Sequence, residues 1–526
     1  MEPRSLPGWL SFLFTRVLFA GAPDADARVR TLPLLIVLLL PAALLYPTLD
    51  FHLLEPDEGR YAQIPKEMLE NDSWVVPTLQ GLPYLDKPPL MYWLVALSYR
   101  TFGVTPEAAR LVPAVCVHLT VLAVYLIGRR SIGARGAFWA ALLLSVAPGF
   151  VSVARFLLLD GLLTLCVTVS VLCGFESVRT GRFKPGWWVA AAVASGLGFL
   201  TKGPIAEVLL FVPLWAFGIL TRASGVRPTP VPLHWYAIFF AIVVGVNVPW
   251  YVAMYREQPQ FLGYFFWQHN VMRFLQPFDH LQPIWYYVPI LIGGLLPGTL
   301  LFVAYARMLS RGEDAGDSRP STAGGFWLLA GLWCVFFFSC SGSKLPTYVL
   351  PAYPFLCLAL GEFVARTRWN TAFATRAAVA GMAAFVLLVH HVGMPWYARE
   401  RSPYGKPELV AKFLADPEMK VVCFPRNCDS LAFYFDRADL RNVRTKDVNQ
   451  MFVDCHHRPR TVILFTHRES LAGFKRTLPP SLGIVEEVSL RRRYGNRLLD
   501  TLFGVTPWGL CDVIVLEPKY QVPPSE

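Results

Sequence analysis

The chain has 526 residues, of which 54% are hydrophobic and only 16% are charged, and its mean hydropathy is +0.42. A soluble globular protein carries about a quarter charged residues, so this composition excludes one. The net charge of +11 would suit a nucleic-acid partner, but the basic residues gather in short loops between apolar runs. That distribution is typical of a membrane protein, and we exclude nucleic acid as a partner.

Apolar runs long enough to cross a bilayer as a helix recur from residue 31 onward. They lie near residues 31–49, 109–128, 136–154, 161–178, 186–200, 204–220, 233–252, 284–306, 324–342, 347–364 and 373–393. The stretch Pro88–Phe102 is short and starts with two prolines, so we expect a re-entrant or interfacial helix there. The sequence therefore predicts about eleven transmembrane helices, with the N-terminus in the cytoplasm.

This topology sorts the charged residues by membrane face. Short loops rich in Lys and Arg stay cytoplasmic, and two of them carry Arg129, Arg130, Arg135, Arg179, Arg182 and Lys184. Another set falls at the opposite ends of the spans, where ionisable residues are costly unless they are paired or do chemistry. This set is Asp57, Glu58, Arg60, Asp86, Lys87, Arg155, Asp160, Lys202, His269, Arg273 and Lys344. The pattern predicts a site at the outer membrane face.

From about residue 397 the composition becomes that of a soluble domain. The predicted strands are Lys420–Phe424, Thr461–Phe465, Gly483–Leu490 and Val513–Leu516, and the predicted helices are Ser430–Phe435 and Arg468–Arg476. We therefore expect a transmembrane domain over residues 1–396, with outer-face loop helices within 50–107, and a small extracytoplasmic α/β domain over 397–526.

Four of the ten cysteines, Cys423, Cys428, Cys455 and Cys511, fall in the predicted outer domain. An even count in an oxidising compartment favours two disulfides, and four cysteines allow three pairings. Free thiols are one alternative. A zinc site with the neighbouring His456 and His457 is another, although the spacing fits no common zinc motif.

The first group of residues with chemical potential follows the first predicted span, in the sequence EPDEGRYA from Glu55 to Ala62. Adjacent carboxylates beside a membrane, followed by Arg and Tyr, can supply a general base and an anion contact. The alternative is a solvated loop that leads into an amphipathic helix, because Tyr61–Leu69 has helical periodicity.

The second group is the sequence GLPYLDKPP from Gly81 to Pro89. Its prolines place Asp86 and Lys87 at the start of the re-entrant helix, where a lysine can hold a phosphate at the membrane surface. Shorter signals follow, and they contain Arg155 with Asp160, Lys202 in TKGP, His269 and Arg273 in one loop, and Lys344 with Tyr348 in SKLPTY. Each alone is compatible with a snorkelling cation or a structural histidine.

With these residues, in this order, the chain resembles the family of aminoarabinose transferases and protein O-mannosyltransferases, which are membrane glycosyltransferases of the GT-C class. The resemblance covers residues 53–354, and an outer α/β domain favours the aminoarabinose-transferase-like branch. It implies a catalytic role for Asp57, Glu58 and Asp160. The substrate-binding positions that it implies are Arg60, Tyr61, Tyr84, Lys87, Arg155, Lys202, His269, Arg273, Lys344 and Tyr348.

The resemblance also implies a cofactor and a reaction. Asp86 and His269 match the family's positions for a divalent metal, zinc or magnesium or manganese, although several members have Glu where this chain has Asp86. The expected donor is a polyprenyl-phosphate sugar, and the acceptor is a lipid A-like lipid, a glycan or a protein. A single displacement would invert the anomeric centre, with Asp57 positioning or deprotonating an acceptor hydroxyl.

Two other function classes compete with a transferase of the bacterial inner membrane whose C-terminal domain is periplasmic. A secondary transporter would show internal repeats and charges at mid-span, and the sequence has neither feature. A non-catalytic scaffold that binds polyprenyl lipids would have no need of the acidic pair Asp57 and Glu58.

Overall fold

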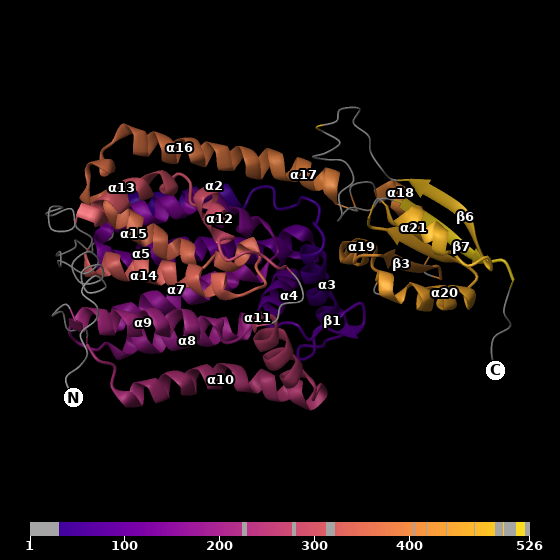
Figure 1. The fold of residues 1–526 in the computed structure, drawn as a ribbon, viewed down its shortest axis with the longest axis horizontal. Coiled ribbons are helices and arrows are strands. Elements are labelled where there is room, and N and C mark those ends of the chain that lie inside the picture. The colour runs from indigo at the N-terminus through magenta and orange to yellow at the C-terminus, as the bar shows by residue number, and fades with distance from the viewer. Residues whose placement is uncertain are drawn as a thin grey trace. The chain divides into compact units, whose positions relative to one another are not determined.

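The structure is a computed structural model, and Figure 1 gives its element labels. It describes residues 31–223, 229–275, 280–311, 321–402, 404, 407–416, 418–437, 439–467, 469–489, 498 and 512–520. The chain forms two compact units. Unit 1 comprises residues 1–47, 85–91 and 110–390, and unit 2 comprises residues 48–84, 92–109 and 391–526. This division differs from the predicted domains 1–396 and 397–526, because two segments of the predicted outer loop group with the C-terminal residues.

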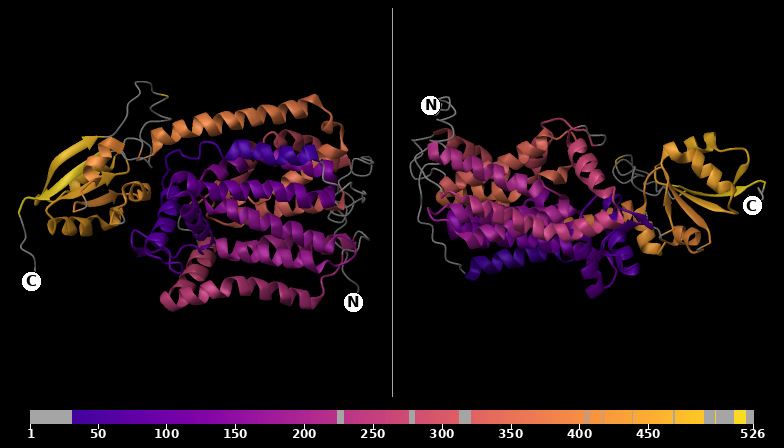
Figure 2. Two further views of the ribbon diagram at one scale, coloured as in Figure 1. Left: turned by 180° about the vertical axis from the view of Figure 1, so that it is seen from behind. Right: turned by 90° about the horizontal axis from the view of Figure 1, so that it is seen from below.

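Unit 1 is a helical bundle. Its long helices α7, α8, α9, α14 and α15 run alongside one another and α10 follows its edge (Figures 1 and 2). The helices are α2 (Thr31–Leu45), α5 (Pro106–Val146), α6 (Pro148–Val151), α7 (Leu159–Val178), α8 (Pro185–Lys202), α9 (Ile205–Ala223), α10 (Leu233–Glu257), η3 (Gly263–Met272), α11 (Arg273–Leu275), α12 (Tyr287–Gly294), α13 (Gly298–Arg311), α14 (Thr322–Cys340), α15 (Ala352–Arg366) and α16 (Phe373–Leu388). Two short 3-10 helices, η2 (Ser152–Arg155) and η5 (Pro346–Val349), precede α7 and α15.

The helix α5 is a hairpin of two helices. Gly133 has φ 76°, a left-handed conformation that glycine adopts at little cost. A Cβ placed on Gly128 would lie 4.0 Å from the Cβ of Ala137, whereas nine residues of continuous helix would separate these positions by about 13 Å. The chain therefore reverses at Gly133, and α5 contains both of the spans predicted near 109–128 and 136–154.

Fewer of the described helices than predicted are long and apolar enough to cross a membrane. Among the residues that the structure describes, six helices are long and apolar enough to cross a membrane, or seven if the bent pair α12 and α13 is one span. The prediction of about eleven is therefore too high by this measure. α5 holds two predicted spans in one element, and α2 and α15 have only 15 residues each. The predicted interfacial helix appears as α4 (Leu90–Phe102), with 13 residues.

The two ends of α7 carry opposite halves of the predicted charge pattern. At its last turn, buried Glu176 forms ion pairs with Arg130, Arg179 and Lys184, which come from two of the basic loops. At its first turn, Asp160 pairs with Lys202 at 2.6 Å. The separation of the two charge groups between opposite ends of the spans is thus seen at α7, while which end faces outward stays a prediction.

Unit 2 contains a mixed five-stranded sheet in the order β4-β3-β5-β7-β6, in which β4, β3 and β5 are parallel and β7 is antiparallel to both neighbours. The strands are β3 (Lys420–Phe424), β4 (Arg441–Asn442), β5 (Thr461–Phe465), β6 (Leu482–Ser489) and β7 (Asp512–Pro518), and the helices around them are α17 (Met394–Arg401), α18 (Pro407–Leu414), α19 (Asp429–Phe435), α20 (Val448–His456) and α21 (Ser470–Thr477). The four strands and two helices predicted here are confirmed within one or two residues, whereas the short β4 and the helices α17, α18 and α20 were not predicted.

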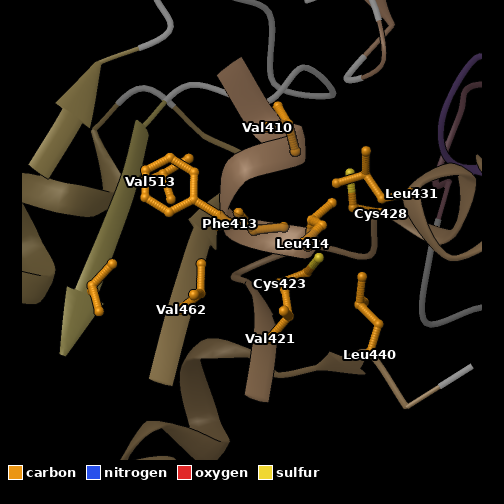
Figure 3. Packing of buried hydrophobic residues seen from close by; sticks show 12 residues of the cluster. Val410, Phe413, Leu414, Val421, Cys423, Cys428, Leu431, Leu440, Val462 and Val513 are labelled. Carbon is orange, nitrogen blue, oxygen red and sulfur yellow. The ribbon is translucent and has the colours of Figure 1, made fainter. Parts of the chain in front are cut away.

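Alternation of side chains along the buried strands gives this sheet two apolar faces. Val421, Cys423, Val462 and Val513 lie on one face and pack with α18 and α19, as Figure 3 shows. The outer-loop helix α3 (Asp57–Glu70) and the hairpin of β1 (Thr78–Leu79) and β2 (Leu82–Pro83) also belong to unit 2. α3 packs against α19, so the acidic motif is built together with the C-terminal α/β fold.

The predicted disulfides are not formed among the cysteines of this domain that the structure describes. Cys423, Cys428 and Cys455 are buried free thiols, and Cys511 lies outside the described residues. Cys423 lies on β3 and Cys428 directly precedes α19, where both pack as small apolar side chains in the core shown in Figure 3. Burial raises the pKa of Cys428, which favours the inert thiol over the thiolate.

Candidate active site

Unit 1 contains a cavity of about 350 Å³ that is lined by polar and apolar side chains. The polar groups are Lys87, Lys202, His269, Asn270, Ser341, Ser343 and Tyr348. The rest of the lining is apolar, with Ile205 and Val208 from α9, Phe265 and Val271 from η3, Phe274 and Leu275 from α11, and Phe337 and Phe338 from α14. A cavity lined by two ammonium groups and by aromatic side chains suits an amphiphile with an anionic head.

Lys87 and His269 meet at one side of this cavity. The Nζ atom of Lys87 lies 2.6 Å from Nε2 of His269, so residues 182 positions apart in the sequence share a hydrogen bond. His269 is held on η3, a π-helix whose Tyr264 donates a hydrogen bond to Asp86 Oδ1 at 2.6 Å. η3 thus presents Tyr264 and His269 to the Asp86–Lys87 segment. π-helical turns are rare and often mark functional sites, which supports a functional role for η3.

Lys202 forms the second cationic group. Its Nζ atom lies 2.6 Å from Asp160 Oδ1 and 4.3 Å from the ring centroid of Tyr348, a cation–π contact. Lys202 is at the C-terminal end of α8, where a positive charge interacts favourably with the helix dipole. Asp160 therefore serves as the counterion of Lys202 in this structure, and Tyr348 shields the ammonium group on its other side.

Two predicted binding residues tie elements together instead of lining the cavity. Lys344 is 3% exposed, and its ammonium donates hydrogen bonds to the carbonyl oxygens of Gln282, at 2.9 Å, and Ser341. Arg155 is fully buried and donates to the carbonyls of Leu45, Pro47 and His390. The side chain of Arg273 lies outside the described part of the chain.

The described residues do not form a complete metal site around Asp86 and His269. Among them, no group of three His, Cys, Asp or Glu side chains is close enough to hold a metal ion. In addition, Nε2 of His269 faces an ammonium group, and Asp86 accepts a hydrogen bond from Tyr264. These two side chains alone fit a metal poorly, because protein metal sites usually supply three or more ligands. Metal dependence therefore stays a prediction.

The acidic motif in unit 2 separates into an exposed and a buried carboxylate. The Asp57 side chain is 41% exposed and lies 3.6 Å from Arg60. Glu58 is 2% exposed, and its Oε2 accepts a hydrogen bond from the backbone N–H of Leu54 at 2.9 Å. Glu58 thus fixes the turn before α3, while Asp57 is the carboxylate that a solute can reach.

The glycine of the motif is required by packing. A Cβ on Gly59 would lie 2.9 Å from Glu55 Oε1 and 3.0 Å from the carbonyl carbon of Asp429, distances too short for a real side chain. α3 can therefore approach α19 closely only with glycine at this position.

The aromatic residues of the two motifs are packed around Arg60. Tyr84 lies under its guanidinium, with 5.9 Å between the guanidinium carbon and the ring centroid. Tyr61 is buried against Tyr92, with ring centroids 6.2 Å apart, and burial raises the pKa of Tyr61. Burial opposes the charge of Arg60, but Tyr84, Tyr61 and the carboxylates of Asp429 and Asp57 together raise its pKa.

Several residues of these sites were not predicted from the sequence. Asn270, Ser341 and Ser343 line the cavity and directly adjoin predicted residues, so proximity was an available signal. Asp429 and Glu55 lie beside Arg60 in unit 2. No local pattern marks Asp429, because its relation to Arg60 arises only from tertiary packing.

A protein-family model described as dolichyl-phosphate-mannose-protein mannosyltransferase matches residues 86–251. An undecaprenyl phosphate-alpha-4-amino-4-deoxy-L-arabinose arabinosyl transferase of Edwardsiella ictaluri is 32% identical over 371 residues, which cover 68% of this chain and 64% of that protein. A protein of the same name from Pseudomonas savastanoi pv. phaseolicola is 35% identical over 344 residues, 64% of this chain and 61% of that protein. The chain thus matches somewhat less than two thirds of the length of these relatives.

The fold is also that of a solved relative. The crystal structure of ArnT from Cupriavidus metallidurans bound to undecaprenyl phosphate aligns with a TM-score of 0.71 at 20% identity, covering 93% of this chain and 98% of that chain. The same protein in its apo state aligns with a TM-score of 0.69. The chain is therefore ArnT-like: it has this fold, and residues 86–251 match the family model. The predicted resemblance is thereby confirmed, as is a helical membrane part joined to a C-terminal α/β part.

Proposed function

We propose that this ArnT-like chain transfers a monosaccharide from an undecaprenyl-phosphate donor to an acceptor at the outer face of the bacterial inner membrane. The observation that carries this proposal is the amphiphilic cavity, whose lining combines Lys87 and Lys202 with apolar and aromatic side chains. The family supports the same donor class, since the named relatives are undecaprenyl-phosphate-dependent transferases.

In the proposed reaction the lysines act on the leaving group. An oxygen of the acceptor attacks the anomeric carbon, the bond from that carbon to the phosphate oxygen breaks, and undecaprenyl phosphate leaves with the electron pair. Lys87 and Lys202 stabilise the charge that develops on the phosphate. Asp160 and His269 hold these ammonium groups in place before the reaction, which reduces the reorganisation that the transition state requires.

We propose Asp57 as the carboxylate that positions or deprotonates an acceptor hydroxyl, because it is the exposed acid of the motif. Attack from the side opposite the phosphate would invert the anomeric centre. If the acceptor is itself a phosphate, no base is needed, and Asp57 orients the sugar instead. The sugar of the named relatives, 4-amino-4-deoxy-L-arabinose, is the first donor sugar to test, with lipid A as the first acceptor.

The test uses purified protein with a panel of undecaprenyl-phosphate sugars, lipid A and cell-envelope extract, and it follows release of undecaprenyl phosphate. Wild type should turn over one donor, while Lys87→Ala and Lys202→Ala should lose activity. Lys475→Ala is a matched control, because it removes a lysine from an exposed ion pair with Glu487. Donor binding without turnover in the presence of extract would favour the scaffold, and no donor binding at all would favour the transporter.

A further inference from the structure

A buried polar network joins the acidic motif to the C-terminal α/β fold within unit 2. Asp429, at the start of α19, has a side chain that is 0% exposed. Its Oδ1 atom accepts hydrogen bonds from Gln80 Nε2 at 2.9 Å and from Asn442 Nδ2 at 2.8 Å. Its Oδ2 atom lies 3.8 Å from Nε of Arg60. One carboxylate therefore contacts the hairpin before Tyr84, the edge strand β4 and the guanidinium of the motif.

The same part of the C-terminal fold holds both flanks of the motif. Upstream of α3, Glu55 Oε1 accepts a hydrogen bond from the backbone N–H of Ser430 at 2.6 Å. Downstream, the carbonyl of Gln80 accepts a hydrogen bond from Arg441 at 3.0 Å. In addition, Glu67 on α3 accepts from Gln80 N at 2.6 Å. The position of Gln80, which has φ 55° at the hairpin turn, is thus fixed from two directions.

Within this network, Arg60 has two acidic partners and one aromatic partner. Arg60 lies between Asp57 at 3.6 Å and Asp429 at 3.8 Å, with Tyr84 under its guanidinium. Asp57 is exposed and Asp429 is fully buried. A buried carboxylate is costly unless it is paired with a cation, so Asp429 holds Arg60 more firmly than a solvated partner can.

We infer that Asp429 is a positioning residue for the reaction, because it orients Arg60 beside Asp57, and that the C-terminal α/β fold is therefore required for turnover. This inference rests on the proposed transferase function. Asp429 is not expected to touch substrate. Its effect should pass through Arg60, which predicts that the two residues act as one unit.

A double-mutant cycle tests this coupling with the full-length protein. Asp429→Asn keeps one oxygen for Gln80 and Asn442 but removes the negative charge that faces Arg60, so kcat/KM should fall at least about tenfold. Arg60→Ala should lower kcat/KM similarly. In the Arg60→Ala background, Asp429→Asn should cause less than about a twofold further loss. Losses that multiply would overturn the inference.

Asp439→Asn is the matched control, because it breaks another Asp–Arg pair of the same fold, with Arg437 at 2.7 Å. Its activity should stay within about twofold of wild type. Wild-type turnover separates the two proposals. If wild type is inactive on every donor, the transferase function fails, whereas an active wild type with an unchanged Asp429→Asn variant overturns only the positioning role.

A second measurement keeps the test decisive if Asp429→Asn does not fold. Arg60 faces Asp57, Tyr61, Tyr84 and Asp429, and its removal leaves Asp429 without this cation. The melting temperature of Arg60→Gln should therefore fall below that of wild type, because Asp429 stays buried without its cation. Equal melting temperatures would overturn the inference.

Discussion

Two turns of unit 1 have nearly the same sequence pattern but use their lysines differently. Lys202 is the last residue of α8 and Lys344 follows α14, and each lies two residues before a proline at which the chain turns towards the next helix. Lys202 lines the cavity and contacts Asp160 and Tyr348 through its side chain. Lys344 instead donates to the backbone carbonyls of Gln282 and Ser341. The comparison shows that the partners of a cation indicate its role. A lysine that contacts side chains at a cavity can still bind a ligand, whereas a lysine that is bonded to backbone carbonyls stabilises the fold.

The largest expected effect is on activity at Lys202. Lys202→Ala removes an ammonium from the lining of the cavity, and kcat/KM should fall at least about 100-fold, the usual range for one electrostatic contact with a developing charge. The melting temperature should also fall, because the variant leaves the buried carboxylate of Asp160 without this cation. Assay of undecaprenyl phosphate release with a melting curve checks both. A stable variant with full activity would break the distinction between the two lysines.

The opposite result is expected at Lys344. Lys344→Met keeps the length of the side chain but removes its hydrogen bonds to two carbonyls. Charged hydrogen bonds contribute about 2 kcal/mol each, so the melting temperature should fall by several degrees. Desolvation already lowers the pKa of Lys344. The specific activity of the folded fraction should remain within about threefold of wild type, and a large loss without destabilisation would place Lys344 with Lys202.

Gly59 extends the comparison to unit 2, where the close packing of α3 against α19 explains why the motif has a glycine at this position. Gly59→Ala places a methyl group against Glu55 and Ser430, and the required separation of α3 and α19 should cost about 1–3 kcal/mol. Chemical denaturation of the full chain measures this loss. Gly473→Ala is the control, since a Cβ there meets no atom within 4 Å. Equal stability of both variants would show that α3 tolerates a larger distance from α19.

The sequence was sufficient for some parts of this structure and not for others. The strands β3 and β5 were predicted with their observed bounds, because buried β-branched runs between turn residues are a local signal. The reversal at Gly133 was implied by two separate apolar runs. The difference between Lys202 and Lys344 was not predictable, because both positions have the same local pattern and only the tertiary fold brings Gln282 or Asp160 to them. Asp429 likewise acquires its role through a contact with a residue more than 300 positions away.

The last expected effect concerns the pH dependence of stability at Glu55. Burial and the neighbouring Asp429 raise the pKa of Glu55 from 4.5 to about 8, and the hydrogen bond from Ser430 opposes this rise only in part. The folded state therefore keeps this proton between about pH 4.5 and pH 8, whereas the unfolded state loses it. The contribution of the protonated Glu55 to stability is thus fully present below pH 4.5 and is lost as the pH rises towards 8.

Glu55→Gln cannot ionise. Its melting temperature should thus exceed that of wild type increasingly from about pH 5 to pH 8, and the difference should level off above pH 8, with Glu486→Gln, an exposed acid, as the control. Parallel curves for wild type and Glu55→Gln would mean that Glu55 is ionised in the fold, and that the cation Arg60 compensates two carboxylates at once.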